Sequence, residues 1–416
     1  MQRRRAVAKT IPGDSRLFDG AIVRHTARSF ASLPGPHHAQ ALLAEIATAP
    51  CTFAPASPKA PLALYGAGQL GHLAYDFLRA VGHPDVTIVD RNARCLAQNG
   101  DWSGAALLEP GQISKEMKSD VRLAVSVVTS PYVPIEHFLS DLGFRDIVPF
   151  YDLAESFRHL HPLSNGWFAP QFSQEDQRRT VEVLSRWNDD KSRAHHLQFL
   201  AWRRLREEWS FELAPLLPSD RYFIPEVTSV LRSDEVLIDA GAHHGHVTKA
   251  FVQKTSGAFG AIVAIEPDPS NRALLQDNLK SWLPDDPRVT VYDFALADVE
   301  GEAPFRADLG YASQLSDTGH VRVGVRCLDG VRLSPTFVKL HLEGAELLAL
   351  TGARKTLLSS RPIVAATVYH NSDGVWKTAL WLMQTLPDYR FLFRLDSWCG
   401  TGAIIYAIPN ERCRTS

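Results

Sequence analysis

Three ionisable side chains alternate with apolar residues in the segment FVKLHLEGAELLAL, residues 337–350. Lys339, His341 and Glu343 occupy every second position, and a β-strand sends alternate side chains to opposite faces. A cation, an imidazole and a carboxylate would therefore share one face of a strand that ends at Glu343-Gly344. Buried charges cost several kcal/mol unless they are paired, so we expect Lys339 to pair with Glu343 or with another acid.

This alternation has a catalytic and a structural interpretation. Ligands of open α/β sheets lie beyond the carboxyl ends of the strands, so His341 and Glu343 would face a ligand there. His341, or His370 at the end of a later apolar segment, could then act as a base near neutral pH. The alternative is that Lys339, His341 and Glu343 form only an internal ion-pair network.

A glycine turn in EVLIDAGAHHGHVTKAF, residues 235–251, suggests what the ligand is. Asp239 ends a strand, Gly241 and Gly245 flank a tight loop, and Glu266 ends the next strand. An acid in that place can accept hydrogen bonds from two ribose hydroxyls. The G-x-x-x-G spacing favours a mononucleoside such as S-adenosylmethionine over a dinucleotide, whose pyrophosphate needs more room. The alternative is a purely structural turn.

An earlier glycine turn, YGAGQLGHL, has the G-x-G-x-x-G spacing of a dinucleotide fingerprint. Gly66, Gly68 and Gly71 lie between a strand and a helix, and Asp90 ends the next strand, where it could bind ribose. Either a nucleotide binds there, or the glycines only pack the helix on the strand. Since no hydride-transfer residues follow, a nicotinamide enzyme is disfavoured, and a nucleotide-responsive binding protein is the alternative to an enzyme.

Five histidines could gather at one edge of the second sheet. His243, His244 and His246 lie in the cofactor loop, of which His243 is expected to contact the cofactor, and His341 and His370 end strands. Two or three imidazoles could bind a divalent metal. Because no HExxH or comparable spacing exists, the sequence predicts a base rather than a metal site.

The 416 residues are enough for two domains. Strand–helix alternation predicts an α/β class with two Rossmann-like units and parallel sheets. The last two strands of the second unit are joined only by SWCGT, so the last strand should be antiparallel. The expected divisions are an extension and linker at 1–60, a Rossmann-like unit at 61–152, a helical linker at 153–233 and the second unit at 234–410.

Two further segments are the helical linker and the region around the third strand of the second unit. The helical linker could bridge the units or support a homodimer, although its dense polar residues favour a solvent-exposed amphipathic helix pair. In the second unit, a strand is expected over 289–296. Residues 299–324 replace the helix that should follow this strand. They could shape the pocket for a polar ligand that receives the methyl group of S-adenosylmethionine.

The composition limits which binding partners and which location we expect. A net charge of −2 and a pI near 6.8 give no reason to expect nucleic acid or an anionic membrane. No run of ~18 apolar residues could span a bilayer, and no signal-peptide core follows the basic start. The five cysteines form no CxxC pair, so we expect neither disulfides nor structural zinc, and a cytoplasmic location.

Several motifs in order make residues 220–409 resemble the FkbM-type S-adenosylmethionine-dependent methyltransferases. They are LIDAGAHHGHVT, AIEPDPSNRALLQDNL, FALADVEG, VRCLDG and VKLHLEGAELLALTGA. DRYFIPEV and the Tyr-His pair in PIVAATVYHNSDG are similar to a subgroup that often has an N-terminal Rossmann-like domain.

The resemblance implies a class I methyltransferase fold with a seven-stranded sheet, and methyl transfer to a hydroxyl of a small-molecule acceptor. It implies a cofactor site for S-adenosylmethionine formed by Asp239, Gly241, His243, Gly245, Glu266, and Ala295 beside Asp293 near the adenine. Lys339, Glu343 and Glu346 match the family's K-x-x-x-E-G-A-E. Lys339, His341, Glu343 and His370 are the expected catalytic residues, next to the methyl group that is transferred. His341 replaces the family's usual Asp, which leaves open how the acceptor is activated.

Overall fold

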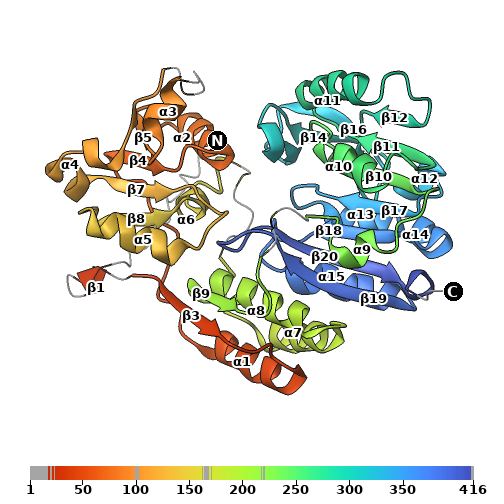
Figure 1. Ribbon diagram of the computed structural model, residues 1–416, viewed down its shortest axis with the longest axis horizontal. Helices are drawn as coiled ribbons and strands as arrows, with labels where there is room; N and C mark the ends of the chain where they lie inside the picture. Colours follow the sequence, from red (N-terminus) through yellow and green to blue (C-terminus); the bar gives the residue numbers. More distant parts are fainter. Residues whose placement is uncertain are drawn as a thin grey trace, which may run out of the picture.

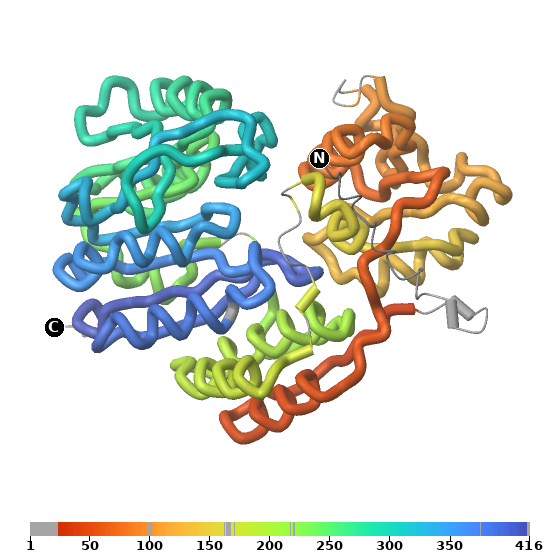
Figure 2. Tube along the Cα trace, turned by 180° about the vertical axis from the view of Figure 1, so that it is seen from behind, coloured from red at the N-terminus to blue at the C-terminus, as the bar shows by residue number. Residues whose placement is uncertain are grey.

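The computed structural model shows two α/β units side by side, with a helical region that runs along both (Figures 1 and 2). It describes residues 17–18, 21–22, 24–98, 102, 104–161, 163, 168–169, 171–216, 218 and 221–413. Residues 1–16 of the expected extension lie outside this set. Among the described helices, none is both long and apolar enough to cross a bilayer.

The C-terminal unit is built on a seven-stranded sheet with the order β12-β11-β10-β17-β18-β20-β19. Its strands are β10 (Val236–Ala240), β11 (Ala261–Ile265), β12 (Val289–Tyr292), β17 (Phe337–Leu340), β18 (Ile363–Thr367), β19 (Tyr389–Leu395) and β20 (Ala403–Pro409). β20 runs antiparallel to both of its neighbours, and the other strands are parallel. The α/β class and the antiparallel last strand are confirmed.

Apolar side chains point to both faces of this sheet, as burial of parallel strands on both sides requires. Ile238 and Val338 pack into one core, whereas Leu237 and Phe337 pack into the other. The helices of the unit are α9 (Pro225–Thr228), α10 (His246–Lys254), α11 (Pro269–Trp282), α12 (Leu328–Val331), α13 (Glu346–Gly352), α14 (Arg354–Ser360) and α15 (Gly374–Thr385). The sheet thus has a fixed register, which sets the neighbours at its carboxyl edge.

The third strand is shorter than the sequence indicated. β12 ends at Tyr292, and Ala295–Leu296 forms β13 in a separate four-stranded sheet with the order β13-β16-β14-β15. The other strands of this small sheet are β14 (Gly301–Arg306), β15 (Gln314–Leu315) and β16 (Val321–Arg326). The sequence predicts one strand over 289–296 because the apolar pattern continues through Phe294.

The N-terminal unit has a parallel sheet with the order β6-β5-β4-β7-β8. Its strands are β4 (Leu62–Tyr65), β5 (Val86–Val89), β6 (Leu107–Leu108), β7 (Arg122–Val125) and β8 (Asp146–Pro149). Its helices are α2 (Gln69–Ala80), α3 (Ala93–Gln98), α4 (Lys115–Asp120), α5 (Tyr132–Asp141) and α6 (Phe150–Glu155). A short β1 (Leu17–Phe18) and β2 (Ala21–Ile22) pair precedes it.

The helical region is not the solvent-exposed helix pair that the sequence favoured. It contains α1 (Pro36–Thr48), α7 (Gln174–Arg186) and α8 (Asp190–Leu205), with β3 (Thr26–Phe30) parallel to β9 (Glu207–Phe211). α8 is buried between α1 and β19 (Figure 1). The expectation failed because polar residues of α8 are buried with partners, for example His195, whose Nδ1 accepts a hydrogen bond of 3.2 Å from Leu395 N.

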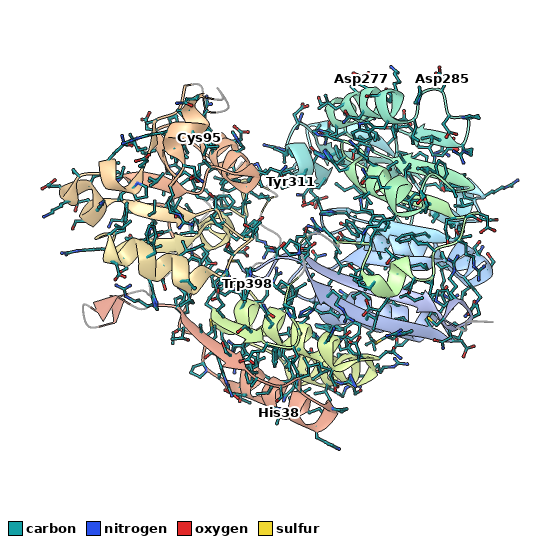
Figure 3. All side chains as sticks on the ribbon, in the orientation of Figure 1. His38, Cys95, Asp277, Asp285, Tyr311 and Trp398 are labelled. Carbon is teal, nitrogen blue, oxygen red and sulfur yellow. The ribbon has the colours of Figure 1, made fainter. Side chains whose placement is uncertain are left out.

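The tip of the β19–β20 hairpin connects the two units. Trp398 N donates to Val128 O at 2.7 Å, and Cys399 packs with Trp202 in a core of the N-terminal unit. Figure 3 labels Trp398 between that unit and the helical region. SWCGT is therefore a docking element as well as a turn.

We predict that Gly71→Ala destabilises the chain, whereas Gly68→Ala does not. A Cβ on Gly71 would lie 2.2 Å from Gly66 O, but one on Gly68 would have nothing within 4 Å. Such overpacking costs roughly 1–3 kcal/mol, measurable as a lower urea midpoint. Equal midpoints for the two variants would contradict this packing role.

Candidate active site

The loop after β10 depends on two glycines. Gly241 has φ +70° and Gly245 has φ +84°, the left-handed region that favours glycine. A Cβ on Gly241 would lie 1.9 Å from His341 O, and one on Gly245 would lie 2.8 Å from Leu275 Cδ1. The loop therefore passes close over the end of β17, and no larger residue would fit without moving it.

Glu266 follows β11 and holds this loop from the other side. Its Oε2 accepts a hydrogen bond of 2.7 Å from His243 N, and its Oε1 accepts one of 3.0 Å from Asp268 N. The side chain is buried, and burial raises the pKa of its carboxyl to about 7 despite these two backbone donors. Each oxygen keeps a further lone pair for a ligand.

Asp239 and Lys339 form a buried ion pair at the centre of the sheet. They are direct neighbours in the register of β10 and β17, and Lys339 Nζ lies 2.9 Å from Asp239 Oδ1. Thr248 Oγ1 donates to the other oxygen of Asp239 at 2.8 Å. Lys339 thus pairs with the acid across the sheet and not with Glu343.

The ammonium of Lys339 also fixes the cofactor loop. It donates to Gly241 O at 2.7 Å and to Ala240 O at 3.2 Å. Two of the three donors of the ammonium thus go to these carbonyls, while its charge is paired with Asp239. Lys339 is therefore a positioning residue in this geometry, although the sequence suggested a place beside the reaction.

Two imidazoles converge on one oxygen of Glu343. His341 Nε2 lies 3.1 Å and His370 Nε2 lies 3.3 Å from Glu343 Oε1. The two rings are stacked, with centroids 5.2 Å apart. His341 comes directly after β17 and His370 shortly after β18, so neighbouring parallel strands bring both to one edge of the sheet. We call these three residues the His-Glu-His cluster.

Glu346 supports this cluster from the start of α13. Its Oε1 lies 3.1 Å from His370 Nδ1 and accepts a hydrogen bond of 2.7 Å from Thr367 Oγ1. Its two oxygens also accept hydrogen bonds from Leu342 N and Gly344 N, at 3.0 and 3.1 Å. Glu346 is thereby fixed by both its own turn and β18.

Three residues beside the cluster were not identified from chemistry in the sequence. Tyr222 Oη lies 2.8 Å from His341 Nδ1, and Tyr369 Oη lies 3.2 Å from His341 Nε2. Arg221 donates to Tyr369 Oη at 2.7 Å and forms an ion pair of 2.8 Å with Asp396. Their only sequence signals were the DRYFIPEV lead-in and the Tyr-His pair, which entered through resemblance.

The cluster carries unequal charges. Burial would lower the pKa of His370, but Glu343 and Glu346 outweigh it and raise that pKa to about 9. Burial lowers the pKa of His341 to about 3, so its ring is neutral. The pKa of the Glu343 carboxyl is lowered, because its two histidine partners outweigh its burial. Two carboxylates against one imidazolium leave one uncompensated negative charge.

The backbone is strained where it aims these groups. Glu343 has φ +50° and Tyr222 has φ +67°, a region that non-glycine residues seldom occupy. Such conformations persist only where the surroundings hold them, and they concentrate at functional sites. The strained Glu343 directs its carboxylate back toward the two imidazoles.

A cavity of about 1340 Å³ lies against the cluster and extends to both units. Its walls include Gly241, His243, Glu266, Ala295, Lys339, His341 and Glu343 of the C-terminal unit, and Gly66, Gly68, Asp90, Ser126 and Val127 of the N-terminal unit. Tyr311, in the short helical turn between β14 and β15, also lines it, and Figure 3 labels Tyr311 on the side that faces the N-terminal unit. The two glycine turns therefore border one space.

Some predicted site residues do not border this space. Asp239, Gly245 and His370 lie behind its wall and support residues that line it. Asp293 is exposed and is not among the lining residues, whereas Ala295 is one of them. The reason is the early end of β12, after which the chain turns toward the small sheet.

The residues of the N-terminal glycine turn also divide into those that line the cavity and those that support the turn. Gly71 packs under the turn, whereas Gly66, Gly68 and Asp90 line the cavity. Asp90 Oδ2 accepts a hydrogen bond of 2.9 Å from Ala67 N, and its Oδ1 accepts one from Asn92 N at 2.7 Å. Its carboxylate holds the loop in the same way as Glu266 does in the other unit.

Comparison with known proteins gives a family match within the C-terminal unit. Residues 239–393 match the family described as the methyltransferase FkbM domain, which confirms the resemblance seen in the sequence. The structure of methyltransferase FkbM from Methylobacillus flagellatus KT is similar at TM-score 0.57 and 19% identity, covering 90% of this chain and 94% of that chain. At this identity the likeness shows the fold alone.

More distant structures share only part of the fold. The S-adenosylhomocysteine-bound methyltransferase PaMTH1 from Podospora anserina matches at TM-score 0.29 and 13% identity, over 57% of this chain and 88% of that chain. A precorrin-6y C5,15-methyltransferase from Geobacter metallireducens GS-15 matches at TM-score 0.29 and 18% identity, over 44% and 88%. Neither bears on the chemistry of this chain. No curated protein matches it.

We predict that Lys339→Met destabilises the chain by roughly 3–5 kcal/mol, because it leaves the Asp239 carboxylate buried without its cation. Lys377→Met is the matched control, since Lys377 pairs with Asp373 at 3.1 Å on the surface. Removing that exposed pair should cost less than about 1 kcal/mol. Urea unfolding measures both variants, and a similar loss in each would contradict the central role of the buried pair.

We predict that Glu266 makes the chain less stable as the pH rises. The folded state keeps a proton on Glu266 up to a pKa of about 7, whereas the unfolded state loses it near 4.5. The free energy of unfolding should therefore fall through this window, by roughly 3 kcal/mol. Glu266→Gln should remove this part of the pH dependence in urea titrations. An unchanged slope would contradict the raised pKa.

Proposed function

We propose that this chain, which carries a methyltransferase FkbM domain over residues 239–393, transfers the methyl group of S-adenosylmethionine to a hydroxyl of a small, polar, sugar-like acceptor. The observation that carries this proposal is the Gly241–Gly245 loop beside Glu266, at the edge of the sheet where open α/β folds bind ligands. The cavity of about 1340 Å³ exceeds the roughly 300–1,000 Å³ of a pocket for one ligand, which leaves room for the acceptor.

The lining of the cavity suits an adenosyl group. The carboxylate of Glu266 has lone pairs left for the two ribose hydroxyls. Phe294, Ala295 and Leu296 offer an apolar wall for the base. His243 Nε2 is buried and has no hydrogen-bond partner within the described residues, so it can serve a polar atom of the ligand.

The charge of the cluster suits a sulfonium. S-adenosylmethionine presents a methyl group on a positively charged sulfur, and its displacement by an oxygen mainly requires alignment. The uncompensated negative charge of Glu343 and Glu346 against His370 favours a cation in the adjoining cavity. The same electrostatics would disfavour a second anion at this wall.

The acceptor would approach from the side of the small sheet. Asp308, Tyr311, Ser313 and Gln314 line that part of the cavity and provide hydrogen-bonding groups for a polar ligand. The neutral ring of His341 donates from Nε2 to the ionised carboxylate of Glu343, and its Nδ1 faces Tyr222 Oη. The Glu343 carboxylate, which lines the cavity, can in turn accept a hydrogen bond from an acceptor hydroxyl. His341 thus takes the place where the family usually has Asp.

We predict that isothermal titration detects binding of S-adenosylmethionine to the intact chain and that Glu266→Ala weakens it at least about tenfold. Each hydrogen bond to a charged group contributes roughly 1.5–3 kcal/mol, and 1.4 kcal/mol corresponds to tenfold. Glu302→Ala is the matched control, because Glu302 pairs with Arg322 on the exposed surface of β14. Its affinity should equal that of the unchanged chain.

One combination of binding results would contradict methyl transfer by this chain. If the intact chain does not bind S-adenosylmethionine but binds a nucleotide, and Gly68→Trp abolishes that binding, the N-terminal turn is the working site. The protein would then be a nucleotide-responsive binding protein, and methyl transfer would be excluded.

A further inference from the structure

We propose that the His-Glu-His cluster is a binding site for a divalent first-row transition-metal ion in the wall of the cavity. His341 Nε2 and His370 Nε2 lie 3.1 and 3.3 Å from the same oxygen, Glu343 Oε1. All three ligand atoms lie within 4.8 Å of one another. An ion with bonds of ~2.1 Å holds neighbouring ligand atoms roughly 3.0–3.4 Å apart, so a small movement would complete the site.

The second nitrogen of each ring is already fixed. His341 Nδ1 lies 2.8 Å from Tyr222 Oη, and His370 Nδ1 lies 3.1 Å from Glu346 Oε1. Metal-binding histidines characteristically give their other ring nitrogen to a carboxylate or a similar partner, which sets the ring orientation. Both Nε2 atoms thus lie close to Glu343 Oε1, and an ion would take the place of the protons on the two Nε2 atoms.

These outer partners are themselves held. Glu346 accepts hydrogen bonds from Thr367 Oγ1, Leu342 N and Gly344 N. A buried carboxylate needs such partners, and here they also hold Glu346 in the one geometry that a coordination site requires of an outer partner. Gly344 has φ +106° and Glu343 has φ +50°, so the turn that carries the carboxylate is strained in order to aim it.

One side of the His-Glu-His cluster faces the cavity. His341 and Glu343 line the cavity, and His370 forms the buried back of the site. Two imidazoles and one carboxylate with free positions form a donor set that suits Zn²⁺, Fe²⁺, Co²⁺ or Mn²⁺. Mg²⁺ and Ca²⁺ prefer sites made only of oxygen ligands and fit less well.

The site would act on the acceptor, an inference that rests on the proposed function. An acceptor hydroxyl oxygen could take a free coordination position, which would orient it and help it to lose its proton to water. The oxygen would then bond to the methyl carbon as the bond from that carbon to sulfur breaks, and S-adenosylhomocysteine would leave. With an ion in place, the lone pair of His341 Nε2 is used by the metal, so the ion and not the imidazole meets the hydroxyl.

The sequence raised His341 and His370 as possible metal ligands but favoured a base over a metal site. The ligands of the proposed site come from the ends of two strands, β17 and β18, which are neighbours in the sheet but are separated by α13 and α14 in the chain. Spacing rules such as HExxH describe ligands on a single helix, and so they do not detect it.

Metal binding to the full-length chain tests the proposal without measuring activity. After treatment with a chelator, the protein is titrated with ZnCl₂ and with CoCl₂, and calorimetry and the visible absorption of Co²⁺ are recorded. We expect one ion per chain, binding at least tenfold weaker in Glu343→Gln and His341→Ala, and 10–100-fold weaker in Tyr222→Phe through the lost outer partner. His38→Ala, on the exposed surface of α1 (Figure 3), should bind as the unchanged chain does.

Either of two results would overturn the metal site: no stoichiometric binding by the unchanged chain, or equal affinity in the His38→Ala and Glu343→Gln variants. The cluster would then be an internal ion-pair network. Titration of the metal-free chain with S-adenosylmethionine is done in parallel. Cofactor binding without metal binding refutes only the metal site, whereas metal binding without cofactor binding refutes the proposed function.

Discussion

The buried ion pair between Asp239 and Lys339 is the constraint on which the rest of the site depends. It joins β10 to β17 at the centre of the seven-stranded sheet, and the same ammonium binds the carbonyls that open the glycine loop. Taking two charges out of water is costly, and the hydrogen bonds from Thr248 to Asp239 and from Lys339 to the two loop carbonyls help to offset that cost. The pair therefore fixes the position of the glycine loop relative to the end of β17, next to His341.

From this pair the site is built outward along two strand ends. The glycine loop and Glu266 form one wall, and the His-Glu-His cluster forms the next. The strained turn at Glu343 and the fixed carboxylate of Glu346 connect the cluster to α13. Since each support is buried, the polar groups that face the cavity are pre-arranged, which is what a reaction governed by alignment requires.

Much of this could be predicted from the sequence, because it depends on local pattern. The parallel strands, the antiparallel β20, the two glycine turns and the same-face alternation of Lys339 and His341 all follow from periodicity and turn chemistry. The partner of Lys339 could not be predicted, because the register of β10 against β17 is set by the whole sheet. The burial of α8, the early end of β12 and the roles of Arg221 and Tyr222 also depend on contacts between distant segments.

The central claim is that the second glycine turn and Glu266 hold an adenosyl group with its sulfur facing the His-Glu-His cluster. The most direct measurement is a crystal structure of the chain with S-adenosylhomocysteine. It should show both ribose hydroxyls within hydrogen-bond distance of the Glu266 carboxylate and the sulfur on the side of His341. A nucleoside bound at the Gly66–Gly71 turn instead, or a Glu266 carboxylate that does not touch the ribose, would contradict the account.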